Sequence, residues 1–340
     1  MACNAMQIIE FFQKINAQHV GIAGGKGASL GEMTNTGIPV PPGFVVLAPA
    51  FDRFLEETDL GVEVEAILKK VNYRDINSVD RASNEIRDLI IKAKMPKDIQ
   101  KETISAYNQL ISKNHGSTSP ALRASSPRQG RRDNGYVAVR SSATAEDSKV
   151  ASWAGELETY LNSTDKNLLQ NVKKCWASLY TPRAIFYRHE KKMLKTRVSV
   201  AVVVQQMVQS EISGITFTVH PVTEDRDQML IEAGFGLGEA IVSGSITPDS
   251  YVIDKKNNKI LDVNIAEQTK MIIKKGAGTE EVSVKPVMRI RQKLSGRQIL
   301  ELAKICQRVE AHYKFPCDIE WAYARGKFYI VQSRPITTLK

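Results

Sequence analysis

Four polar side chains near the C-terminus have the types and spacing that suit a metal ion and a phosphate group. Asp318 and Glu320 lie in the run C-D-I-E-W-A-Y-A. Gln332 and Arg334 lie in F-Y-I-V-Q-S-R-P, and the R-G-K turn signal between the two runs predicts a β-hairpin. Side chains two residues apart share a face of a strand, so each strand would present its polar pair on one face. Carboxylate and amide oxygens ligate Mg²⁺ and arginine grips phosphate, although a surface hairpin with solvated charges would show the same pattern.

A glycine-rich segment near the N-terminus, G-I-A-G-G-K-G-A-S-L-G-E-M, is centred on Lys26. Glycines ahead of a helix leave backbone N–H groups open where the helix dipole favours an anion, and Lys26 adds positive charge there. The segment is not a Walker A loop, because Val20 stands where that pattern needs glycine and Gly27 where it needs Ser or Thr. The alternative is a glycine-rich helix start with a solvated lysine.

The segment V-A-V-R-S-S-A-T-A-E-D, residues 137–147, predicts an apolar strand that ends near Arg140. The hydroxyl residues that follow, up to Thr144, could surround phosphate oxygens. The arginine fork presents several donors that fit a tetrahedral oxyanion, so we expect Arg140 to hold a phosphate group. Simple packing of the segment remains the alternative.

A third segment, V-V-V-Q-Q-M-V, runs from Val202 to Val208. Its apolar strand is interrupted by Gln205 and Gln206 and is followed by Met207. Backbone groups at such a strand could hydrogen-bond a purine while Met and Val side chains cover its faces. An ordinary core strand with exposed amides is the alternative.

The segment E-A-G-F-G-L-G-E-A-I-V-S-G, residues 232–244, contains alternate glycines. Its spacing is G-x-G-x-G-E and not the dinucleotide fingerprint G-x-G-x-x-G, so a Rossmann fold is disfavoured. The loop still allows the backbone to approach a ligand closely, and Glu239 could accept a hydrogen bond from a ribose hydroxyl or contact a metal ion.

The elements that must position these residues form a helical first part and a strand-rich second part. Helices are expected, from spacing or composition, over 7–18, 26–36, 48–58, 62–72, 78–93, 98–113, 166–178, 182–193 and 295–311. Strands are expected in P-V-P-P-G-F-V-V and over 136–140, 158–161, 198–207, 214–219, 228–233, 249–254, 260–265 and 269–274, besides the terminal hairpin. We therefore predict a mixed α+β fold in two lobes, divided into a mainly helical part at 1–112, a flexible basic loop at 113–135 and a strand-rich part at 136–340.

Composition and charge exclude several classes of protein. The net charge is +10, and the loop at 113–135, with five Lys/Arg and one Asp, supplies +4 of it. The rest is spread along the chain with no basic stripe interleaved with aromatics, which disfavours nucleic-acid binding. No apolar run is long enough to span a membrane, and no signal peptide is evident. The four cysteines lack C-x-x-C spacing, which disfavours a zinc site and secreted disulfides and predicts a cytoplasmic protein.

The motifs together resemble the N-terminal nucleotide-binding region of the phosphoenolpyruvate synthase and pyruvate phosphate dikinase family, to which rifampin phosphotransferase is related. The resemblance covers nearly the whole chain, from about residue 20 to residue 338, in the family's order. The residues that carry it are G-G-K-G-A-S-L-G-E-M, I-P-V-P-P-G-F, V-R-S-S-A-T-A-E-D, Q-Q-M-V, G-F-G-L-G-E-A-I-V-S-G with T-P-D-S-Y-V-I-D, and D-I-E-W-A with Q-S-R-P-I-T-T.

This resemblance implies an ATP-grasp fold with ATP held between two lobes, and it implies a role for each matching residue. Glu320 and Gln332 would hold Mg²⁺, and the catalytic residues would be Arg140, Arg334 and Asp318. The ATP-binding residues would be Lys26, Arg140, Thr144, Gln205, Gln206, Met207, Val208, Glu239 and Arg334. Such a site works mainly by positioning and charge neutralisation, and it needs no nucleophilic side chain of its own.

The resemblance also implies an acceptor that this chain lacks. In the family the phosphoryl group passes to a histidine on a separate domain, in a motif like T-S-H-A-A, and then to substrate on a third domain. None of His19, His115, His189, His220 and His312 lies in such a motif. We therefore expect the Mg-ATP-binding domain of a dikinase that phosphorylates a histidine elsewhere, most simply in phosphoenolpyruvate synthesis from pyruvate. An antibiotic phosphotransferase of the rifampin type and a non-catalytic ATP-binding module are the alternatives.

Overall fold

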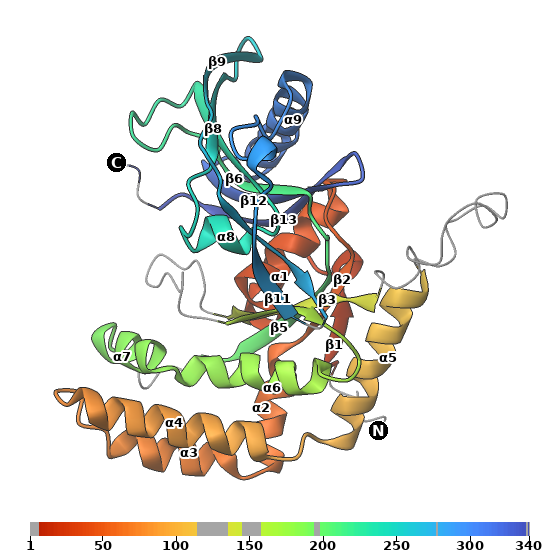
Figure 1. The fold of residues 1–340 in the computed structure, drawn as a ribbon. Helices are drawn as coiled ribbons and strands as arrows, with labels where there is room; N and C mark the ends of the chain where they lie inside the picture. Colours follow the sequence, from red (N-terminus) through yellow and green to blue (C-terminus); the bar gives the residue numbers. More distant parts are fainter. Residues whose placement is uncertain are drawn as a thin grey trace. The chain divides into compact units, whose positions relative to one another are not determined.

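The structure, a computed structural model, describes residues 7–113, 135–144, 158–193, 198–276, 278–337 and 339. Contacts divide the chain into two compact units (Figure 1). Unit 1 comprises Met1–Gly31 and Pro42–Met207, and unit 2 comprises Glu32–Pro41 and Val208–Lys340. The predicted basic loop at 113–135 falls almost entirely on 114–134, which lie outside the described residues.

Unit 1 is built on a five-stranded antiparallel sheet in the order β1-β2-β5-β3-β4. The strands are β1 (Ile9–Phe11), β2 (Gly43–Val46), β3 (Val137–Ala143), β4 (Thr159–Ser163) and β5 (Val200–Gln206). The central strand β5 is a nearly continuous run of buried valines because both of its faces are covered. This sheet fixes which side chains of β3 and β5 share a face.

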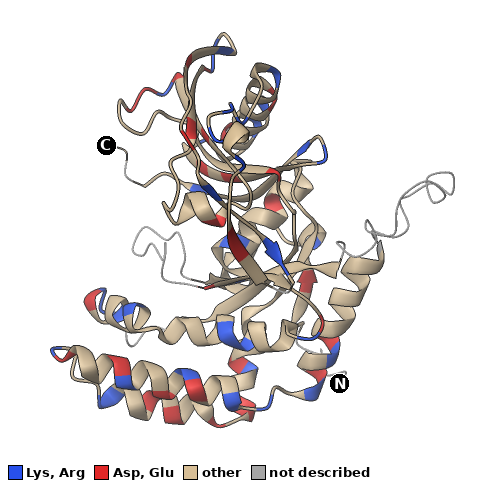
Figure 2. Cartoon of the chain, in the orientation of Figure 1, with Lys and Arg blue, Asp and Glu red and all other residues tan. Residues whose placement is uncertain are grey.

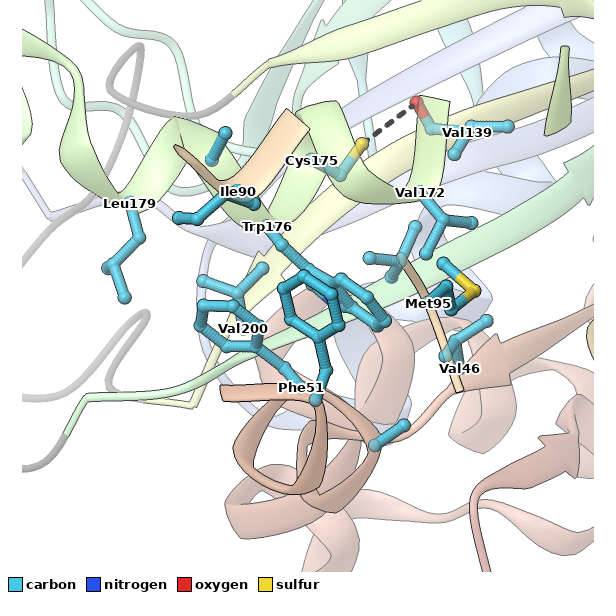
Figure 3. Close-up of a cluster of buried hydrophobic side chains, with 14 of the residues drawn as sticks. Val46, Phe51, Ile90, Met95, Val139, Val172, Cys175, Trp176, Leu179 and Val200 are labelled. Carbon is cyan, nitrogen blue, oxygen red and sulfur yellow. Dashed lines mark hydrogen bonds between the residues drawn. The ribbon is translucent and has the colours of Figure 1, made fainter. Parts of the chain in front are cut away.

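Helices α2, α5 and α6 pack on the strands of this sheet and enclose the core of unit 1. Trp176 lies against Phe51 and Phe54, with ring centroids 5.4 and 5.1 Å apart, and Cys175 Sγ donates to the Val139 carbonyl at 3.6 Å (Figure 3). The helices of this unit are α2 (Ala48–Glu57), α3 (Leu60–Lys69), α4 (Ile76–Lys92), α5 (Lys97–Lys113), α6 (Leu168–Ala177) and α7 (Pro182–Glu190), together with the first part of α1 (Val20–Asn35).

The helix predicted over 7–18 is wrong. This segment forms β1 followed by two 3-10 turns, Phe12–Lys14 and Ala17–His19. Its apolar residues recur at a spacing that also fits a helix, but the backbone of β1 completes the edge of the sheet by pairing with β2. Tertiary pairing therefore overrides the local pattern.

Unit 2 is built on a six-stranded antiparallel sheet in the order β13-β12-β6-β7-β8-β9. Its strands are β6 (Ile212–Phe217), β7 (Gln228–Phe235), β8 (Asp249–Asp254), β9 (Lys259–Asn264), β12 (Cys317–Ala324) and β13 (Lys327–Pro335). A separate two-stranded sheet pairs β10 (Lys270–Lys275) with β11 (Gly278–Ser283), and β11 was not predicted from the sequence. The short helix α8 (Glu239–Val242) follows β7.

Helix α9 (Gly296–Tyr313) packs on β7, β8, β9 and β12. Ser295 begins this helix with a capping box, in which its hydroxyl accepts from Gln298 N and the Gln298 side chain accepts from Ser295 N. The alternate residues Ile319 and Trp321 of β12 are buried, and Gly214 on β6 lacks a side chain because the Trp321 ring occupies that space. Asp318 and Glu320 consequently lie on the other face of the sheet.

The mixed α+β fold with a helical first part and a strand-rich second part is confirmed. Every helix in the described part of the chain is too short or too polar to cross a membrane.

Candidate functional site

The terminal hairpin forms as the sequence predicts. Arg325 and Gly326 connect β12 and β13 with positive φ angles of 52° and 77°, which is the geometry of a tight two-residue turn. The resulting register places Asp318 opposite Arg334 and Glu320 opposite Gln332. All four predicted side chains therefore share one face at the edge of the unit 2 sheet.

The side chains also contact one another in these two pairs. Arg334 Nε donates to Asp318 Oδ2 at 2.8 Å, and Arg334 Nη2 lies 2.7 Å from the same oxygen as an ion pair. Gln332 Nε2 donates to Glu320 Oε1 at 3.1 Å. Burial raises the pKa of Asp318 above its usual range, against the opposing effect of Arg334, and the charge of Glu320 adds to the rise. The carboxylate of Asp318 thus depends on nearby positive charge to stay ionised.

A further carboxylate, Glu232, belongs to the same face. Glu320 lies opposite Ile215 of β6, which lies opposite Glu232 of β7, so the three residues are in line across the sheet. Burial, and then the charge of Asp318, raise the pKa of Glu232. Sequence reasoning gave Glu232 no role, because the run M-L-I-E-A-G-F does not contain the strand register that aligns Glu232 with Glu320.

The donor set on this face suits a hard cation that keeps part of its water shell. Glu320 and Gln332 supply oxygens, which Mg²⁺ prefers, and Mg²⁺ is usually held by one or two protein ligands together with water and phosphate oxygens. Within the described ranges no group of three or more His, Cys, Asp or Glu side chains is arranged around a common metal position. The residues therefore fit a site completed by a bound nucleotide better than a closed protein cage.

Unit 1 holds the second group of predicted residues. Arg140 on β3 and Gln205 on β5 are both buried, and Arg140 Nη1 donates to Gln205 Oε1 at 3.5 Å. Arg140 lies opposite Val203, and Gln205 lies opposite Ala138, so both side chains leave the sheet on the face opposite the Val139 side chain and the core around it. The sheet thus presents a guanidinium and an amide together.

Helix α1 is interrupted beside this face. Gly24 has φ +70°, and any Cβ there would overlap the backbone carbonyl of Ser142. Ser142 Oγ accepts from Gly27 N at 3.2 Å and donates to the Ala23 carbonyl at 3.0 Å, which fixes both sides of the kink. The helix restarts at the kink with the half-buried Lys26 in its first turn, where backbone N–H groups favour an anion.

The structure gives Thr144 and the Gln205–Val208 segment specific hydrogen bonds. Thr144 Oγ1 donates to the Ser199 carbonyl at 3.1 Å. Gln206 N donates to the Pro42 carbonyl at 2.9 Å and Met207 N to the Tyr136 carbonyl at 3.0 Å. A purine base at this segment would therefore use other backbone groups than these two N–H donors.

The glycine loop, defined as Phe235–Gly238, connects β7 to α8 in unit 2. Gly236 has φ +91°, and its carbonyl accepts from the hydroxyls of Ser210 and Ser213 at 2.9 and 2.8 Å. Leu237 N donates to the Ile272 carbonyl at 2.8 Å. Glu239 is exposed at the first position of α8, just after the loop.

The charged side chains on the helices are of both signs. Figure 2 shows Lys and Arg interspersed with Asp and Glu along α3, α4 and α9, without a basic stripe along these helices. This distribution gives no support to a polyanion-binding surface on them.

The sequence matches the family model described as the AMP/ATP-binding domain of pyruvate phosphate dikinase over residues 20–340. It is 45% identical over 339 residues to a probable phosphoenolpyruvate synthase of Methanocaldococcus jannaschii, covering 99% of this chain and 27% of that protein. It is 44% identical over 335 residues to a probable phosphoenolpyruvate synthase of Methanothermobacter thermautotrophicus, covering 98% and 46%. It is 38% identical over 331 residues to a rifampicin phosphotransferase of Bacillus cereus, covering 96% and 36%. The chain thus spans less than half the length of each of these relatives.

Proposed function

The chain belongs to the family of pyruvate phosphate dikinase AMP/ATP-binding domains, and from this premise we propose that it binds Mg²⁺-ATP and transfers a phosphoryl group to a histidine on another domain or chain. The observation that carries the proposal is the paired arrangement of Asp318 with Arg334 and Glu320 with Gln332 on one sheet face. Phosphoryl transfer needs cation ligands and a phosphate-binding guanidinium, and the side chains on this face include both kinds of group, which supports the proposal.

Each residue of the unit 2 face has a proposed task. Glu320 and Gln332 hold Mg²⁺, which when bound neutralises phosphate charge. Arg334 contacts the transferring phosphoryl group, and its hydrogen bond and ion pair with one oxygen of Asp318 fix the orientation of the fork. Glu232 adds negative charge next to the metal position. Catalysis by such a site rests on orientation and charge, since no protein nucleophile is required.

The remaining predicted residues are given nucleotide-binding tasks by this proposal, each described within its own unit. Lys26 and Arg140 bind the phosphates, and Thr144, which directly follows the strand that carries Arg140, also belongs to the ATP-binding residues. The base lies along Gln205, Gln206, Met207 and Val208, and Glu239 accepts from the ribose or contacts the metal.

The complete reaction that fits best is phosphoenolpyruvate synthesis from pyruvate, because phosphoenolpyruvate synthases are among the most similar relatives. The histidine and pyruvate sites would lie in parts of those longer proteins that this chain does not match. Transfer to an antibiotic is the second candidate, and the 38% identity to rifampicin phosphotransferases supports it less. A non-catalytic module is disfavoured because Lys26, Arg140, Glu320, Gln332 and Arg334 all retain chemically competent side chains.

Isothermal titration calorimetry with ATP, in the presence and absence of Mg²⁺, tests the proposed site. The parent chain is expected to bind ATP in a magnesium-dependent way, and Arg334→Ala is expected to weaken binding by about tenfold or more, since a charged hydrogen bond contributes about 1.5–3 kcal/mol. Arg308→Ala is the matched control, because Arg308 donates to the Gly37 carbonyl in the same unit and has no proposed ligand. Equal ATP affinity of the parent and Arg334→Ala would refute the assigned role.

A further inference from the structure

A buried ion pair in unit 2 has no role in the function proposed above. Lys293 Nζ lies 2.7 Å from Asp249 Oδ1, and both side chains are 0% exposed. Asp249 comes from the segment T-P-D-S-Y-V-I-D, which helped to identify the family but contains no assigned ligand. A fully buried pair is expensive to desolvate, and an apolar pair of similar volume is often as stable. Its presence therefore calls for a task besides stability.

Both partners of the pair make further hydrogen bonds. Asp249 Oδ1 also accepts from Ala266 N at 3.0 Å, and Oδ2 accepts from Lys293 N at 2.9 Å and from the Tyr251 hydroxyl at 2.8 Å. Lys293 Nζ donates to the Ala266 carbonyl at 2.7 Å. The pair thus connects the start of β8 to residues 266 and 293, which are far apart in the sequence, through one network of hydrogen bonds.

The same arrangement reaches the glycine loop through Phe235. Lys293 Nζ lies 5.5 Å from the centroid of the Phe235 ring, within the range of a cation–π interaction. The buried Gln268 side chain accepts from Phe235 N at 2.8 Å and donates to the Phe235 carbonyl at 3.0 Å, as a neighbouring strand would. Gln268 N is itself bonded to the Arg289 carbonyl at 2.9 Å, on the segment that leads to Lys293.

We propose that Asp249, Lys293 and Gln268 are positioning residues that hold Phe235, and with it the glycine loop, in the conformation that receives the nucleotide. The inference rests on the proposed function for its ligand, Mg²⁺-ATP. The loop benefits from such support because glycine loses more conformational freedom than any other residue when it is fixed, and Gly236 is held in one conformation with φ +91°.

Lys293→Met tests the inference, with Lys255→Met as the matched control. Lys255 also makes a partly buried ion pair in unit 2, with Glu310 at 2.9 Å, and also donates to a backbone carbonyl, that of Thr218, but it has no bond to the glycine loop. Two quantities are measured at a temperature where each variant is folded by circular dichroism: hydrogen–deuterium exchange of the amides of residues 235–237, and the Kd for Mg²⁺-ATP by calorimetry.

Lys293→Met is expected to speed exchange at residues 235–237 and to weaken ATP binding by about tenfold, as loss of a supporting contact typically does. Lys255→Met is expected to lower the Tm while leaving both quantities at the parent values. Parent-like exchange and Kd in folded Lys293→Met would overturn the inference, because the pair would then serve stability alone.

A second variant covers the case in which Lys293→Met does not fold because Asp249 is left as an unpaired buried charge. The double variant Asp249→Asn, Lys293→Met removes both charges and is expected to fold, again with faster exchange at residues 235–237 and weaker ATP binding; unchanged values would overturn the inference. The exchange measurement needs no nucleotide. It therefore tests the support of the loop even if the parent chain fails to bind ATP, an outcome that would refute the proposed function instead.

Discussion

At the scale of single residues, the unit 2 face sets three carboxylates close to one guanidinium: Asp318 lies opposite Arg334, Glu320 lies opposite Gln332, and Glu232 is in line with Glu320 across the sheet. The two hairpin pairs share a face as predicted, because strand alternation depends only on neighbours along the chain. Glu232 could not be found in this way. Its alignment with Glu320 depends on the register of β12 with β6 and of β6 with β7, which alternation within one strand does not contain.

The pKa of Glu232 leads to a prediction about stability and pH. Its folded-state pKa is raised by burial and by Asp318, so the folded chain binds more protons than the unfolded chain between the unfolded and folded pKa values. The stability that protonated Glu232 provides is therefore present at low pH and lost as pH rises through the folded pKa. Glu232→Gln is expected to raise the Tm of the ligand-free chain at pH 7 and to lose this advantage in acid.

Thermal unfolding followed by circular dichroism from acid to neutral pH measures this effect. Glu301→Gln, on the exposed side of α9, serves as the control and is expected to shift the Tm little at any pH. A lower Tm for Glu232→Gln than for the parent at pH 7 would contradict the prediction. If Glu232 also adds charge near the metal, the same variant should gain less Tm from Mg²⁺-ATP than the parent does.

At the scale of elements, long segments with one dominant pattern were predicted well and short segments set by contacts were not. The helices α4, α5 and α9 and the terminal hairpin lie close to their predicted positions. Residues 7–18 were predicted as a helix because their apolar spacing fits one, whereas β1 forms by pairing with β2. The glycines around Lys26 indicated a helix start, but nothing in their spacing placed the kink at Gly24, which depends on Ser142 from a strand more than a hundred residues later.

The kink in α1 leads to a matched pair of substitutions. Gly24→Ala adds a Cβ at a positive φ angle and against the Ser142 carbonyl, so it is expected to lower the free energy of unfolding by about 2 kcal/mol or more. Gly21→Ala, in the same helix with open space around its Cα, is expected to be neutral or stabilising by up to about 1 kcal/mol. Urea denaturation of both variants measures the difference, and equal stabilities would show that the kink carries no strain.

At the scale of the whole molecule, the two units are not made of two consecutive stretches of sequence. Residues 32–41 belong to unit 2 although unit 1 surrounds them in the sequence. Three contacts account for this: Ile330 N donates to the Pro39 carbonyl at 2.8 Å, Arg308 to the Gly37 carbonyl at 3.2 Å, and His312 Nε2 lies 2.8 Å from Glu32 Oε1. A change of composition near 113–135 does not reveal such an exchange of segments, since it depends on contacts with residues some three hundred positions later.

Because this chain spans less than half the length of the phosphoenolpyruvate synthases that it matches, the complete reaction is expected to need a further part of such a protein. If the acceptor histidine lies outside this chain, the chain alone should bind Mg²⁺-ATP but release little AMP. Adding, as a separate polypeptide, the part of a longer phosphoenolpyruvate synthase that is proposed to bear the histidine should then convert ATP and water into AMP, inorganic phosphate and a phosphorylated histidine, since AMP formation releases two phosphoryl groups and the histidine takes one. A dikinase reaction leaves AMP, whereas a simple kinase leaves ADP, so chromatography of the nucleotides together with phosphohistidine detection distinguishes the two.

Glu320→Gln keeps the size of the side chain and removes its charge. It is expected to slow AMP release by about a hundredfold, whereas the control variant Glu301→Gln is expected to leave the rate of AMP release unchanged. AMP release at the parent rate by Glu320→Gln would remove the unit 2 face from the mechanism. ADP as the product, with no phosphohistidine, would reject the dikinase assignment while leaving nucleotide binding intact.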